Sequence, residues 1–89
     1  LNLGRHQEAI ADLSKALRAS PEGARAAILN DRGVARSKAG DPDGAIADYS
    51  AALERDPDFH PAILNRGAAL FDIEDAEAAL EDAEAALRL

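Results

Sequence analysis

The sequence contains no cysteine, methionine or tryptophan, and its 89 residues include only one tyrosine and two phenylalanines. Without cysteine, the chain can form neither a disulfide framework nor a thiolate metal site. With so few aromatic side chains, the core must be built mostly from Ala, Leu and Ile, which requires helices that approach one another closely. A chain of this length forms one small domain at most. We therefore expect a single domain of tightly packed helices.

Long hydrophobic runs are also absent. No apolar stretch approaches the roughly 20 residues that cross a bilayer, and no charged segment followed by an apolar one opens the chain. We expect no membrane partner, and the cytoplasm is the default localisation. The chain begins at Leu1 without a Met, so we interpret it as part of a longer polypeptide.

Charge is distributed unevenly along the chain, whose net charge is -7. Residues 1–40 hold seven Lys or Arg and four Asp or Glu, whereas residues 41–89 hold three and thirteen. The acidic half repels phosphate backbones, which argues against nucleic acid as a partner. The asymmetry favours a basic protein segment or a second copy docking end to end. The alternative is that acidic surface residues merely keep an Ala-rich protein soluble.

The sequence repeats itself. Gly33 and Gly67 are 34 residues apart, as are Ala52 and Ala86, while Pro21 and Pro57 are 36 residues apart. A period of this length predicts a stacked array of helix pairs. Each unit of such an array contacts only its neighbours, and together the units form a long surface for a partner.

Proline and glycine divide the chain into helical segments. Pro21 and Pro57 each follow an amphipathic stretch, and the residue before a proline is disfavoured in a helix. Asp41 is a suitable N-cap, and Pro42 fits the first turn of the next helix. Residues 74–87 are one seven-residue pattern written twice, which is too short for a coiled coil but rich in helix-forming Ala and Glu. The predicted helices span about residues 4–19, 24–39, 42–55, 60–72 and 74–87.

The middle segment carries a recognisable set of paired residues. They are Arg32-Gly33, Gly40-Asp41, Ala45-Ile46, Asp48-Tyr49, Ala52-Leu53 and Asp56-Pro57. Their spacing resembles the tetratricopeptide repeat, a helix-turn-helix unit of about 34 residues. The resemblance implies an all-α, right-handed solenoid of antiparallel helix pairs with about five helices in one domain. Residues 1–23 would form the second helix of a truncated repeat, followed by repeats at 24–59 and 60–89.

The resemblance also implies a structural role for small residues. Gly33 and Gly67 on first helices would face Ala45 and Ala79 on second helices, so that the backbones can approach closely. The complete set of expected structural residues is Gly33, Gly67, Ala45, Ala79, Ala52, Ala86 and Pro57. Two departures stand out, since Arg36 replaces an aromatic residue of the family pattern and Glu74 replaces the glycine found at Gly40.

A charge pattern recurs in the copies. Asp12, Asp48 and Asp82 hold one equivalent position, while Arg32 and Arg66 hold another. We hypothesise that each Arg bridges to such an Asp across the helix pair or in the preceding repeat. The alternative is that these side chains are simply solvated, because exposed ion pairs contribute only about 0 to 1 kcal/mol.

First helices line the concave groove of the family, where extended peptides bind. By resemblance, the groove here would be lined by Asn30, Asp31, Val34, Lys38, Leu64, Asn65, Ala68, Phe71 and Asp72. The Asn65 amide could pair with a peptide main chain, and Phe71 could be an apolar anchor. Alternatively, Asn65 bonds within the array and Phe71 fills the core.

Nothing in the sequence indicates catalysis. The carboxylates are spread over helix faces, and His6 and His60 have no second ligand at metal-binding spacing, so we expect neither a cofactor nor a metal. We predict a non-enzymatic scaffold that binds a protein or peptide. The alternative is a self-assembly element, in which terminal helices carrying Leu17 and Leu87 dock between chains and form a homo-oligomer.

Overall fold

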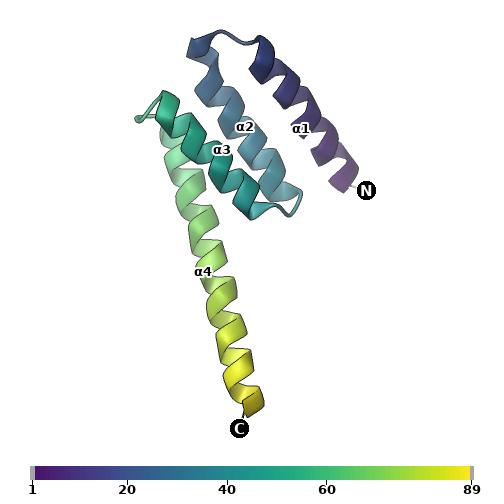
Figure 1. Ribbon diagram of the computed structural model, residues 1–89, viewed down its shortest axis with the longest axis vertical. Helices are drawn as coiled ribbons and strands as arrows, with labels where there is room; N and C mark the ends of the chain where they lie inside the picture. Colours follow the sequence, from purple (N-terminus) through teal and green to yellow (C-terminus); the bar gives the residue numbers. More distant parts are fainter. Residues whose placement is uncertain (1, 89) are drawn as a thin grey trace.

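The computed structural model describes the backbone of residues 2–88 and the side chains of residues 4–77. Over that range the chain is all-α without any strand, as predicted. The elements are α1 (Asn2–Ala19), a short 3₁₀ turn η1 (Glu22–Ala24), α2 (Arg25–Lys38), α3 (Pro42–Arg55) and α4 (His60–Arg88). Each α-helix packs against the next one along the chain (Figure 1). The handedness of a longer array stays a prediction.

The turn between α2 and α3 forms because three adjacent residues favour it. Gly40 has a φ of 85°, a left-handed conformation that costs a glycine little. Asp41 caps α3, since its Oδ1 accepts a hydrogen bond from the Gly44 amide at 2.9 Å. Pro42 then occupies the first turn of α3. The chain therefore reverses direction here, and α2 and α3 form an antiparallel pair as predicted.

The connection between α1 and α2 is held by contacts to both α1 and α3. Pro21 precedes η1, and α2 begins at Arg25. The Arg25 Nη1 atom donates to the carbonyl oxygen of Leu17 at 2.9 Å, which ties the start of α2 to the last turn of α1. The exposed Glu22 also pairs with Arg55 of α3 at 2.6 Å.

The core is made of small side chains, as the composition predicts. Ala45, Ala52 and Ala62 are completely buried, and the only tyrosine of the chain, Tyr49, is 3% exposed. Ala26 and Leu29 of α2 and Ala69 of α4 complete this buried cluster. The core therefore sits where α2, α3 and the first half of α4 meet.

The prediction of five helices is wrong over residues 2–88, because the segments expected at 60–72 and 74–87 form the single helix α4. Its second half projects beyond the other helices (Figure 1). The turn is missing because Glu74 and Ala76 hold the positions of Gly40 and Pro42, so nothing interrupts the helix there.

The fused helix also corrects the expected contact between Gly67 and Ala79. Both residues belong to α4 and lie twelve positions apart, so they cannot face each other across a helix pair. A Cβ atom on Gly67 would meet no other atom within 4 Å. Ala79 and Ala86 lie outside the residues whose side chains are described, and Pro57 is exposed in the turn between α3 and α4.

Candidate interaction surface

An open hollow of about 330 Å³ lies between α1 and α2. Four apolar and three polar side chains line it: Ala9, Leu13, Val34 and Ala35, together with His6, Asp31 and Lys38. A hollow with an apolar lining and a few charged groups suits an amphipathic ligand, whose apolar part displaces water while the charges fix its orientation.

The hollow contains most of the predicted groove residues of α2 but none of those of α4. Asp31, Val34 and Lys38 line it, whereas no residue of α4 does. Asn30 is buried, with 8% of its surface exposed, and so offers little to a ligand.

Most of the predicted groove residues of α4 are exposed to solvent. Leu64 is 72% exposed and Phe71 is 63% exposed, and Ala68 and Asp72 are exposed as well. Phe71 therefore does not fill the core of the described chain. Large exposed apolar side chains on an otherwise Ala-rich helix are available for contacts with another molecule.

Asn65 is half-buried and bonds within the array. Its Nδ2 atom donates to the Oδ1 atom of Asn30 at 3.1 Å, which links α4 to α2. Because this bond uses one amide group of each residue, the two asparagines serve first to hold the two helices in register.

Sequence reasoning missed the contribution of α1 to this surface. His6, Ala9 and Leu13 line the hollow, but the family resemblance assigns the groove to first helices, and α1 is a second helix. Their spacing of three and four residues was the available signal, because it places all three on one helix face.

A buried ion cluster joins α1, α2 and α3. Asp48 is 3% exposed, and its two carboxylate oxygens accept hydrogen bonds from Nη2 and Nε of Arg32 at 2.8 and 2.9 Å. Arg36 donates to the same carboxylate at 3.0 Å. Arg32 also donates to the Ser14 hydroxyl at 3.2 Å. The predicted pairing of Arg32 with Asp48 is therefore confirmed, and it is bidentate, the geometry that orients an Arg most firmly.

This cluster shifts the ionisation of its members. The hydrogen bonds that Arg32 donates to Asp48, opposed by partial burial and aided by the negative charge of Asp48, raise the pKa of the Arg32 guanidinium above its ordinary value. Burial, and then the charge of Asp48, raises the pKa of the Tyr49 hydroxyl. Arg36 was missed as a member, although its position four residues after Arg32 places it on the same face of α2.

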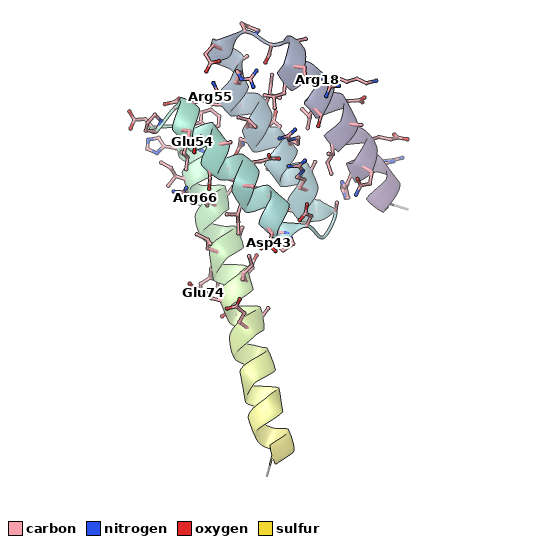
Figure 2. All side chains as sticks on the ribbon, in the orientation of Figure 1. Arg18, Asp43, Glu54, Arg55, Arg66 and Glu74 are labelled. Atoms are coloured by element: carbon pink, nitrogen blue, oxygen red, sulfur yellow. The ribbon has the colours of Figure 1, made fainter. Side chains whose placement is uncertain are left out.

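Arg66 of α4 repeats only part of this arrangement. It donates to the Ser50 hydroxyl at 3.3 Å, just as Arg32 donates to Ser14, which holds the equivalent position one repeat earlier. Among the described side chains, Arg66 forms no ion pair with a carboxylate. Asp82, the residue expected to pair with it, lies outside the described side chains. Figure 2 shows Arg66 beside α3 and Glu74 farther along α4.

Among the side chains described, no group of three or more His, Asp or Glu residues could hold a metal ion. Across the described helices, none is both long and apolar enough to cross a membrane.

Comparison with known proteins places these features in a family. The tetratricopeptide repeat pattern matches residues 26–59 and, separately, residues 1–22. The chain is 42% identical over 86 residues to Protein FlbA of Caulobacter vibrioides, covering 97% of this chain and 14% of that protein. It is also 42% identical over 71 residues to the Protein SGT1 homolog of Oryza sativa subsp. japonica, covering 76% of this chain and 19% of that protein.

The chain thus spans less than one fifth of the length of these curated relatives. No solved structure gives a significant match. The two matched segments, the antiparallel pair of α2 and α3, and the small buried residues at repeat spacing agree with one another. The chain therefore belongs to the tetratricopeptide repeat family of protein interaction modules.

Proposed function

We propose that this domain binds a peptide or helix of a partner protein along the surface formed by α1, α2 and the first half of α4. The observation that carries the proposal is the exposure of Leu64 and Phe71, which are 72% and 63% exposed. These two side chains lie seven positions apart on α4 and therefore share one helix face with Ala68. A few anchor side chains supply most of the affinity of a typical protein interface, and exposed apolar groups on one face can act as such anchors.

We infer that the hollow between α1 and α2 is a second contact site for the same ligand. Its apolar lining suits one large apolar side chain of a ligand, and Asp31 and Lys38 can pair with charged groups beside it. We infer that the ligand is an amphipathic segment that carries at least two apolar side chains, one for the hollow and one for α4.

The scaffold role requires no catalytic group, cofactor, nucleic acid or membrane. Tetratricopeptide repeats are in general non-catalytic, and the ionised side chains described here are committed to structural contacts or spread over the surface. We place the protein in the cytoplasm, as a default.

A random peptide library displayed on phage and panned against the 89-residue chain tests this function. We expect the selected peptides to be amphipathic, and Leu64→Asp and Lys38→Glu to weaken their binding at least about tenfold, because each variant changes an exposed contact without disturbing the core. Ala47→Asp, on the exposed face of α3, is the matched control. Peptides that bind all four proteins equally would contradict the proposal.

We propose self-assembly as the alternative role, because Ile63 and Leu70, on another face of α4, are 41% and 45% exposed.

A further inference from the structure

The first half of α4 carries a symmetric pattern of exposed apolar side chains around Gly67. Two apolar residues stand four and three positions before this glycine, and two stand three and four positions after it: Ile63, Leu64, Leu70 and Phe71. In that order they are 41%, 72%, 45% and 63% exposed. The large exposed hydrophobic side chains of residues 4–77 are therefore all arranged around one glycine.

Helix geometry places this pattern on one side of α4. Because a helix turns about 100° per residue, Ile63 and Leu70 lie about 40° and 60° to one side of Gly67. Leu64 and Phe71 lie about 60° and 40° to its other side. The whole pattern thus occupies an arc of about 120°, and the core residues of α4 lie outside it. We call this arc the Gly67 face.

Gly67 leaves a gap in the middle of the Gly67 face. A Cβ atom at this position would meet no other atom within 4 Å. At Gly33 of α2, by contrast, such an atom would lie 2.5 Å from the ring of Tyr49, where α3 comes close. A glycine without a Cβ atom allows a second helix to approach its backbone closely. The Gly67 face therefore has room for another helix at its centre.

Two polar residues extend the symmetry. His60 and Glu74 stand seven residues before and after Gly67, and both are exposed. Seven residues make two turns less about 20°, so both side chains lie almost in line with the glycine. Along one helix they are about 21 Å apart and cannot contact each other. An imidazole N–H can donate to a carboxylate, so this pair is complementary only between two chains.

We propose that two copies of this chain pack their α4 helices antiparallel through the Gly67 face, with a twofold axis at Gly67. In such a pair each side of the face meets the same side of the other copy. Ile63 then contacts Leu70 of the second copy, and Leu64 contacts Phe71 of the second copy. The two glycines meet at the axis.

The symmetry of the sequence argues for a second copy as the occupant. An interface between two identical chains requires complementary groups at equal distances on the two sides of the axis. The Gly67 face meets this requirement with its apolar pairs three and four residues away and with His60 and Glu74 seven residues away. A different partner protein would require no such symmetry.

The proposal gives the self-assembly role a defined register, and it does not rest on peptide binding. Leu64 and Phe71 belong to both proposed surfaces, so a chain in the dimer cannot bind a ligand through them. Leu70 belongs to the dimer surface alone. Substitutions at Leu70 therefore test the dimer separately from the peptide site.

Analytical ultracentrifugation of the 89-residue chain tests the dimer. Because the interface is small, we expect a reversible dimer with a dissociation constant between micromolar and millimolar. A salt concentration of about 0.15 M screens the repulsion between two chains of net charge -7. Leu70→Asp sets a carboxylate against Ile63 of the second copy and should weaken the dimer at least about tenfold while peptide binding persists. A wild-type chain that stays monomeric at millimolar concentration would overturn the proposal.

Charge exchange between two variants tests the antiparallel register. His60→Glu places two carboxylates opposite each other, and Glu74→Lys removes the acceptor of the imidazole, so each should weaken the dimer at least about threefold. An equimolar mixture should restore the wild-type dissociation constant or lower it, because the introduced Glu of one chain then faces the introduced Lys of the other.

Asp72→Lys is the matched control. It makes the same charge change as Glu74→Lys, but about 140° around the helix from Gly67, and should not weaken the dimer. Circular dichroism of each variant checks that the helices remain. A mixture that stays as weakly associated as the single variants would show that His60 does not face Glu74 of a second copy, and the proposed dimer would be wrong.

Discussion

The antiparallel pair of α2 and α3 and the single helix α4 derive from the same repeat pattern but end in different structures. In the pair, Gly40 and Pro42 allow the chain to reverse, and the face of α2 is buried. In α4, Glu74 and Ala76 continue the helix, and the equivalent face stays bare. The two repeats therefore differ at the turn, and with it in whether this face is buried within the chain or exposed.

Removal of the Asp48 carboxylate is expected to have the largest effect on the covered pair. Asp48→Ala leaves Arg32 and Arg36 without their shared partner, and loss of one member of a buried ion pair typically costs about 3 to 5 kcal/mol. We expect a free energy of unfolding lower by about that amount in urea titrations. Asp12→Ala, at the equivalent but exposed position of α1, should stay within about 0.5 kcal/mol of wild type. Equal losses in both variants would refute the role assigned to the cluster.

A larger residue at Ala45 should separate α2 from α3. Ala45 is completely buried, so Ala45→Leu overpacks the contact and is expected to cost about 1 to 3 kcal/mol or more. Ala47→Leu places the same side chain on the exposed face of α3 and should leave the melting temperature nearly unchanged. Equal melting temperatures for the two variants would show that the register of the pair is incorrect.

Substitution by Ala should lower the stability of the fold at Gly33 and raise it at Gly67. Gly33→Ala forces a Cβ atom against the buried ring of Tyr49 and is expected to destabilise the fold by about 1 to 3 kcal/mol. Gly67→Ala meets open space and gains helix propensity, so it should stabilise α4 by up to about 1 kcal/mol. Thermal unfolding followed by circular dichroism measures both. A loss of stability in Gly67→Ala would place a second helix closer to α4 than the structure does.

Much of the fold could be predicted because local signals agree with the repeat. Asp41 and Pro42 mark the start of α3 by their own chemistry, and the recurrence of Arg32 and Asp48 at fixed spacing predicted their ion pair. These features depend on nearby residues or on one repeated interval, so a single sequence contains them.

The features that the sequence did not predict depend on a balance between two possible structures or contacts. Glu74 was visible as a departure from the repeat, but whether it prevents the turn depends on the balance between helix continuation and burial of the face around Gly67. In the same way, Asn65 could bond to a ligand or to Asn30, and only the spacing of α2 and α4 decides between them. The hollow beside α1 was missed because the family pattern assigns ligand contacts to other helices.

Alkaline pH should loosen the covered pair slightly, through its only tyrosine. Burial, and then the charge of Asp48, raises the pKa of Tyr49 above the ordinary value of about 10. A group with a raised pKa in the folded state contributes stability that is complete below about pH 10 and is lost as the pH rises through its folded value. This loss amounts to at most about 1.4 kcal/mol per pH unit. Because the chain has no other tyrosine, tyrosinate absorbance reports this ionisation directly. Tyr49→Phe keeps the ring against Gly33 and should abolish the dependence, whereas a folded protein whose tyrosine titrates at about pH 10 would show that the ring is not enclosed between α2 and α3.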